Sequence, residues 1–169
     1  MSFLLVRPAL ARAPGAYAEK KTIELMAAVS VAYLPVSSKT FNYNFAPVFN
    51  YFFAENWYLG GDLGLYYFYL TSGDSQNPDI NFSGLGFSPA ASLGYARAFS
   101  PRTYWFTDLG YGYAVCFGCQ TSALGSSLVS SIGLKYDLGF GLATIGTNFI
   151  YNESLGSIMR LFLGVSVYF

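Results

Sequence analysis

The sequence has no histidine and very little charge. Of its 169 residues, 9 are Lys or Arg and 9 are Asp or Glu, so charged residues make up 11% and the net charge is zero. Without imidazole, the chain lacks the usual general base of hydrolytic sites and a common zinc ligand. The balanced charge, without basic clusters, argues against nucleic-acid binding. Soluble domains carry about 25% charged residues, so an ordinary water-facing surface is also disfavoured.

A long apolar helix is missing as well. A membrane-spanning helix needs about 20 mainly apolar residues. The longest uncharged run, 109–134, is interrupted by glycine, serine and threonine at nearly half of its positions. Yet hydrophobic residues make up 53% of the chain and aromatic residues 20%. This apolar content must therefore be distributed over many short segments, which is typical of strands.

From residue 22 onward, apolar residues alternate with small or polar ones. A period of two is the pattern of a strand with two different faces. Eight segments show it and leave no room for a long helix, so we predict eight antiparallel strands: 22–34, 41–53, 57–70, 82–96, 103–115, 124–136, 142–151 and 158–169.

The two faces of these strands differ in bulk and charge. One face carries large apolar side chains and no charge, whereas the other carries many Gly and Ser together with the charged residues. The interior of an eight-stranded barrel is too narrow for the bulky set. The bulky face must point outward, where its solvent is lipid. The predicted fold is all-β, an eight-stranded antiparallel up-and-down transmembrane β-barrel over residues 22–169.

Aromatic residues support this orientation. If the strands run alternately up and down, outward aromatic residues collect at both ends of an aliphatic band, as expected at the two membrane interfaces. One predicted girdle contains Tyr51, Phe53, Trp57, Tyr95, Trp105, Tyr136 and Phe169. The other contains Tyr33, Phe41, Tyr43, Tyr67, Tyr69, Tyr113 and Tyr151.

The connections indicate the direction of the barrel. Short turns are expected at 54–56, 97–102 and 137–141, and longer loops, including 71–81, at the opposite end. Because outer-membrane barrels have short periplasmic turns, both termini are expected in the periplasm. Residues 1–21 are expected to be an export-signal remnant or a disordered arm. They contain two A-x-A patterns typical of signal-peptide cleavage, at 9–11 and 16–18.

The whole pattern over residues 22–169 resembles the small bacterial outer-membrane β-barrels of the OmpA-transmembrane and OmpX type. The final strand adds Gly164-x-x-Val167-x-Phe169, which resembles the C-terminal signal read by the barrel assembly machinery. The resemblance implies a Gram-negative outer membrane and cell envelope. It implies contact with membrane lipid and lipopolysaccharide, the assembly machinery as a transient partner, a monomer and no cofactor.

Charged residues on the inner faces are the candidate functional residues. We expect a lumen charge network of Glu24, Asp62, Asp108, Lys135 and Arg160. It could satisfy itself within a filled interior or line a narrow path for ions. Strand 82–96 contributes only small inward residues, so large aromatic residues on neighbouring strands are expected to fill the space beside it.

Three local features complete the sequence-based picture. Cys116 and Cys119 form a CxxC pattern, interpreted as a loop-stapling disulfide, with free thiols and a redox or metal role as alternatives. Pro47 and Pro89 fall within strands, where each is expected to cause a bulge or a local defect in the ladder.

These features favour an outer-membrane barrel without catalytic activity, with a structural or envelope-integrity role and a side-chain-filled interior. The alternative is a porin-like narrow pore or a small-ligand transport barrel. A surface adhesin is less favoured because the loops are short. Lipid A acylases and deacylases also use eight-stranded barrels, but those enzymes rely on a His that this chain lacks. No catalytic, cofactor or metal site is expected.

Overall fold

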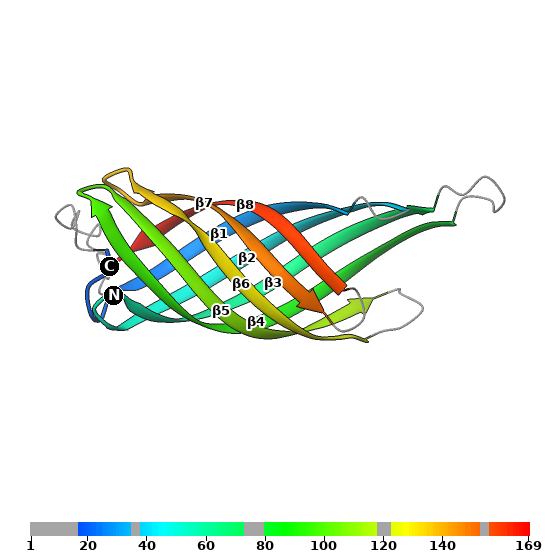
Figure 1. The fold of residues 1–169 in the computed structure, drawn as a ribbon, viewed down its shortest axis with the longest axis horizontal. Coiled ribbons are helices and arrows are strands. Elements are labelled where there is room, and N and C mark those ends of the chain that lie inside the picture. Colours follow the sequence, from blue (N-terminus) through cyan, green and yellow to red (C-terminus); the bar gives the residue numbers. More distant parts are fainter. Residues whose placement is uncertain (1–16, 35–37, 73–79, 118–122, 153–155) are drawn as a thin grey trace, which may run out of the picture.

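Eight antiparallel strands close into a barrel in the structure, which is a computed structural model (Figure 1). It describes residues 17–34, 38–72, 80–117, 123–152 and 156–169, without the side chains of 32–34, 38–42, 68–72, 80–83, 123–124 and 156. The strands are β1 (Ile23–Leu34), β2 (Ser38–Ala54), β3 (Trp57–Ser72), β4 (Ile80–Ser100), β5 (Thr103–Phe117), β6 (Ala123–Asp137), β7 (Leu142–Asn152) and β8 (Gly156–Tyr168).

Each strand pairs with its neighbour in the sequence, and β1 also pairs with β8 to close the barrel. The closing seam sets Ala28 opposite Gly164 and Leu25 opposite Val167. The start of β1, the C-terminus and the three short turns lie at the same end (Figure 1). We call this end the terminal end and the opposite one the loop end. The predicted fold class is confirmed.

Most of the strands are longer than the alternation alone predicted. β4 begins at Ile80 and ends at Ser100, so only Pro101 and Arg102 separate it from β5. The expected turn 97–102 is therefore too long, because pairing with β5 continues from Arg97 to Ser100. A two-residue link is also the shortest common connection between antiparallel strands.

The outer surface of the barrel is apolar, as predicted. Leu85, Tyr111, Leu161 and Val165 are each more than 60% exposed, and Leu63 and Ile132 are more than half exposed. Along β5 and β7, most inward positions are buried while outward ones are exposed or half-buried. A water-facing sheet would hide this surface, so its solvent must be lipid. No helix long and apolar enough to cross a membrane occurs among the described residues.

The two mid-strand prolines interrupt pairing on one side only. Between β2 and β3, pairing skips Ala46 and Pro47 and resumes in the same register at Val48. Between β4 and β5, it skips Ser88 and Pro89 and resumes at Ala90. Because proline has no N–H to donate, each ladder loses its bonds there. The prediction of a local ladder defect is confirmed, and neither site shows a register shift.

Candidate functional site: the barrel interior

Large aromatic side chains lie over glycines inside the barrel. The ring of Tyr58 on β3 lies across Gly94 on β4, where a Cβ atom would overlap it, and Tyr66 lies across Gly86 in the same way. Phe106 similarly covers Gly133. The small inward residues of β4 thus make room for rings from the adjacent strand. This confirms the expected filling by aromatic residues for Tyr58 and Tyr66.

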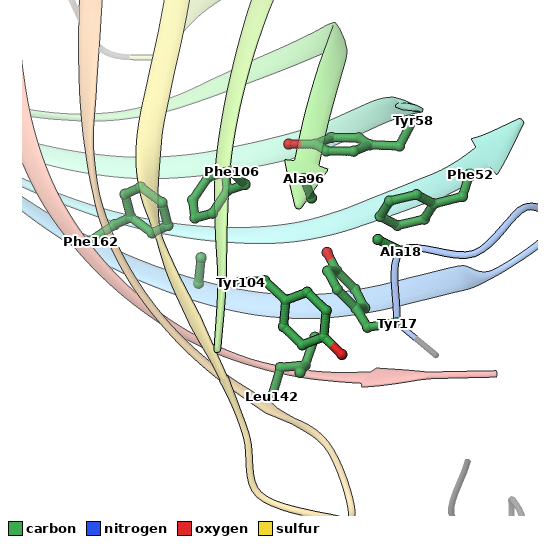
Figure 2. Packing of buried hydrophobic residues seen from close by; sticks show 10 residues of the cluster. Tyr17, Ala18, Phe52, Tyr58, Ala96, Tyr104, Phe106, Leu142 and Phe162 are labelled. Carbon is green, nitrogen blue, oxygen red and sulfur yellow. The ribbon is translucent and has the colours of Figure 1, made fainter. Parts of the chain in front are cut away.

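The terminal end of the lumen is closed by an aromatic cluster around Tyr17. Tyr17 is fully buried, and its ring makes edge contacts with Phe52, Tyr104 and Tyr168 at centroid distances of 5.1, 5.0 and 5.5 Å. Figure 2 shows the Tyr17 ring between those of Phe52 and Tyr104. Edge-to-face packing of this kind stabilises a cluster beyond the area that it buries. Side chains therefore fill the lumen at this end.

Backbone hydrogen bonds hold the segment that carries Tyr17 in place. The N–H of Lys21 donates to the carbonyl of Phe52 at 2.7 Å, and the N–H of Asn56 donates to the carbonyl of Ala18 at 2.8 Å. Both bonds join this segment to the end of β2 and its turn. The domain boundary expected at residue 22 leaves out Tyr17 and Ala18, which pack inside the barrel.

A buried ion pair lies beside this aromatic cluster. The Nζ of Lys135 on β6 lies 2.6 Å from the carboxylate of Glu24 on β1, and the two side chains are 1% and 0% exposed. The Tyr17 hydroxyl donates to Glu24 Oε2 and accepts from Lys135 Nζ, both at 2.6 Å. Asn50 and Ser166 also donate to the Glu24 carboxylate, at 2.8 and 2.7 Å.

These bonds make Glu24 the centre of a satisfied polar cluster. A buried carboxylate is tolerated when it is both paired and hydrogen-bonded, because the bonds replace its lost hydration. The cluster connects β1, β2, β6 and β8 across the lumen. Together, Tyr17, Glu24, Asn50, Lys135 and Ser166 form what we call the plug cluster.

The other three predicted lumen charges do not join this ion pair. Asp108 accepts a hydrogen bond from the Tyr58 hydroxyl at 3.1 Å. Asp62 and Arg160 face the lumen further toward the loop end, and neither forms an ion pair among the described residues. Of the five charges, only Glu24 and Lys135 are in direct contact among the described residues.

The loop-end half of the lumen contains polar atoms without partners. Among the described residues, Ser30 Oγ, Asn44 Oδ1, Asn148 Oδ1 and Arg160 Nε are buried and have no hydrogen-bond partner. Arg160 is only 8% exposed. Toward the terminal end, Thr144 Oγ1 beside Lys135 is also buried without a partner among the described residues. The two halves of the lumen therefore differ chiefly because the terminal-end half holds the aromatic cluster and the ion pair.

The predicted aromatic girdles lie on the outer surface where they are described. At the terminal end, Trp57 contacts Tyr95 and Tyr95 contacts Trp105, with centroids 5.1 and 5.4 Å apart. Exposed aromatic residues at this end also include Tyr51, Phe53, Tyr136 and Phe169, and those toward the loop end include Tyr43, Tyr67, Tyr113 and Tyr151. The side chains of Tyr33, Phe41 and Tyr69 lie outside the described set.

The remaining candidate residues are placed as follows. Cys116 is disulfide-bonded, and Cys119, the other cysteine of the chain, lies outside the described residues. Gly164 and Val167 lie on β8, and Phe169 exchanges backbone hydrogen bonds with Ile23 at 2.9 and 3.0 Å. No cluster of three or more metal-ligating side chains occurs among the described residues.

Sequence reasoning missed three members of the plug cluster: Tyr17, Asn50 and Ser166. Tyr17 precedes the first alternating segment, so periodicity gave no signal for it. Asn50 and Ser166 carry no charge, so a selection of charged inward residues does not include them. The nearest usable signal is the strand register, since Asn50 is directly opposite Glu24 on β2 and Ser166 is two residues from the partner of Glu24 on β8.

Comparison with known proteins identifies the fold. No protein-family model and no curated protein matches the chain. Among solved structures, the outer membrane protein OprG from Pseudomonas aeruginosa is 12% identical, with a TM-score of 0.66, covering 94% of this chain and 99% of OprG. Ail, the attachment invasion locus protein of Yersinia pestis, is 16% identical, with a TM-score of 0.54 and coverage of 89% and 99%.

A de novo designed transmembrane β-barrel also matches, at 11% identity and a TM-score of 0.53, with 89% of this chain and 98% of the design covered. The chain therefore has the fold of the small eight-stranded barrels of bacterial outer membranes, as the resemblance predicted. At these identities the likeness concerns the fold alone.

Proposed function

We propose that this chain, whose fold is that of small outer-membrane barrels, is an integral outer-membrane protein with a structural, envelope-integrity role and a closed interior. The plug cluster is the observation that carries this proposal. Fully buried aromatic rings and a satisfied ion pair fill the lumen at the terminal end, so a solute would have to displace both to pass. The proposal includes no catalysis, since the sequence has no His.

The proposed surroundings follow from the outer surface. Exposed aliphatic residues between the aromatic girdles suit contact with lipid acyl chains, and the girdles suit the two interfaces. We propose lipid and lipopolysaccharide as the lasting partners and the barrel assembly machinery as a transient one. The short turns would face the periplasm, and the protein would act as a monomer.

Planar-bilayer recording tests whether the interior is closed. The protein is first shown to be folded by heat-modifiable migration on a gel, and is then inserted into a bilayer. We expect no steady single-channel steps, because the plug cluster blocks the terminal end. Steady steps that change in Arg160→Ala, but not in the exposed control Arg102→Ala, would show that ions cross the lumen.

Deletion of the gene in the source bacterium tests the structural role. We expect increased sensitivity to detergents and large antibiotics, and recovery when Arg160→Ala is expressed in place of the wild type, because the role needs the barrel wall rather than its loop-end lumen. Unchanged sensitivity in the deletion strain would count against an envelope role.

A narrow pore or ligand-carrying barrel is the second candidate. The observation in its favour is the set of unpaired polar atoms in the loop-end half of the lumen. A closed terminal end argues against passage, but it leaves this half free to hold a ligand.

A further inference from the structure

One charged side chain lies on the lipid-facing side of the strands. Arg97 on β4 is exposed, whereas its neighbour Ala96 is fully buried in the lumen, so Arg97 points outward. The other charged side chains that the structure describes on the strands are buried or face the lumen. Arg97 is therefore an exception on an otherwise uncharged outer surface.

Arg97 lies at the aromatic girdle of the terminal end. It is paired directly with Trp105 on β5. Tyr95, the preceding outward residue of β4, contacts both Trp57 and Trp105, with centroids 5.1 and 5.4 Å apart. Such girdles lie at the level of the lipid headgroups. The guanidinium of Arg97 is therefore expected at the depth of the lipid phosphates.

The apolar surface continues beyond Arg97 toward the water. Phe99, two residues further along β4, is 63% exposed, and in the turn between β6 and β7 Leu138 and Phe140 are 43% and 82% exposed. This turn adjoins the one between β4 and β5, because the N–H of Asp137 donates to the carbonyl of Arg102 at 2.8 Å. We call Phe99, Leu138 and Phe140 the apolar rim. Arg97 thus lies between the girdle and this rim rather than at the edge of the apolar surface.

The charge of Arg97 is not neutralised within the described part of the barrel. The one ion pair there joins Glu24 and Lys135 inside the lumen. Among apolar neighbours and lipid, a charge without a counter-ion is unfavourable. The planar fork of a guanidinium matches two phosphate oxygens, and such charge-assisted bonds are stronger than neutral ones. The group that satisfies Arg97 must therefore be an anion supplied by the membrane interface.

We propose that Arg97, Trp57, Tyr95 and Trp105 form a binding site for the phosphate group of a phospholipid in the leaflet at the terminal end. The guanidinium binds the phosphate oxygens, and the aromatic rings contact the glycerol backbone and the upper part of the acyl chains. The apolar rim limits competition by water. This inference rests on the proposed lipid surroundings of the barrel and adds a defined headgroup site to them.

Tryptophan fluorescence tests the site directly, because the chain has two Trp residues and both belong to the site. The full chain is folded in maltoside micelles, and phosphatidylglycerol with a doxyl quencher near the start of one acyl chain is added. In a parallel series, the same label is carried by diacylglycerol, which has no phosphate. We expect half-maximal quenching at a mole fraction about tenfold lower for the phospholipid, as expected for one charge-assisted bond.

Variants check that Arg97 makes the difference. Each is first shown to be folded by heat-modifiable migration on a gel. In Arg97→Gln, the two labelled lipids should quench equally. Arg97→Lys should retain part of the preference, because the charge remains but the fork is lost. The matched control is Lys20→Gln, which removes an exposed cation before β1 at the same end, and it should retain the full preference.

Three results with the wild-type chain would overturn the proposal. Equal quenching by both labelled lipids would mean that the lipid surface exists but has no headgroup site. Loss of the preference in excess glycerol phosphate, which has no acyl chains, would assign the site to a soluble phosphate. Absence of quenching by either lipid would contradict the lipid surroundings themselves, and so the proposed function as well. The first and third results therefore separate failure of this site from failure of the proposed function.

Discussion

At the scale of single residues, the Glu24–Lys135 pair is the most sensitive point of the barrel. Lys135→Met would leave the Glu24 carboxylate buried without its cation, which costs about 3–5 kcal/mol in buried pairs. We expect the free energy of unfolding, measured with urea in lipid vesicles, to fall by about this amount. The exposed control Lys20→Met should change little.

A double variant distinguishes two causes of the stability loss in Lys135→Met: the lost attraction between the two charges, and the burial of an unpaired carboxylate. The double variant Glu24→Gln with Lys135→Met has no buried charge in the plug cluster. It should recover much of the stability lost in Lys135→Met, because neutral groups cost less to bury than an isolated carboxylate. If the double variant is as unstable as the sum of both single variants, the pair does not act as a unit.

The lumen charges and Tyr17 show which single-residue features can be predicted from the sequence and which cannot. Alternation placed all five lumen charges on inward faces, because direction follows from a period of two. It could not show that, among the described residues, Glu24 forms an ion pair with Lys135 while Arg160 forms none, because contacts across the lumen depend on closure and side-chain length. Tyr17 could not be found at all, since it lies before the first strand.

At the scale of elements, β3 and β4 form a complementary pair of large and small residues. In Gly94→Ala, the added methyl group would overlap the Tyr58 ring. Overpacking of this kind costs about 1–3 kcal/mol. We expect a lower urea midpoint for Gly94→Ala than for Gly61→Ala, in which the nearest atom to the added Cβ is 3.8 Å away.

A double variant tests whether contact with the Tyr58 ring causes the stability loss in Gly94→Ala. When Tyr58 is already replaced by Leu, the further change Gly94→Ala should cost less than it does in the wild type, because the ring that it meets is gone. Additive effects of the two changes would place the cost of Gly94→Ala elsewhere than in this contact.

The element scale was the most predictable from sequence. All eight strands were expected, because the outer side of each strand contacts lipid and the inner side lines the lumen. The two environments favour different residues, which produces the alternation. Their ends were less predictable. β4 continues to Ser100, past its last alternating apolar residue, because backbone pairing does not require an apolar side chain. The ladder gaps at Pro47 and Pro89 were predictable from the missing N–H alone.

At the scale of the whole molecule, the clearest prediction concerns the apolar outer surface. Leu163 lies on β8 between Val29 and Ile145 and is 57% exposed. Leu163→Arg would place a charge within the apolar band, where lipid-facing arginines cost about 2–4 kcal/mol. We expect this loss in urea unfolding from lipid vesicles.

The matched control is Phe140→Arg in the turn between β6 and β7, where Phe140 is 82% exposed. Near an interface, the cost of arginine falls to about 0–1 kcal/mol. Equal effects of the two substitutions would contradict the placement of the apolar band in lipid.

The burial of Tyr17 also has a consequence for the order of assembly. Its contacts come from β1, β2, β5, β6 and β8, because Glu24, Phe52, Tyr104, Lys135 and Tyr168 all touch it. The pairing of β1 with β8 joins residues at opposite ends of the barrel sequence, and such distant contacts tend to form late. Tyr17 can complete its contacts only after β1 pairs with β8. Burial of the Tyr17 side chain therefore indicates that the barrel has closed.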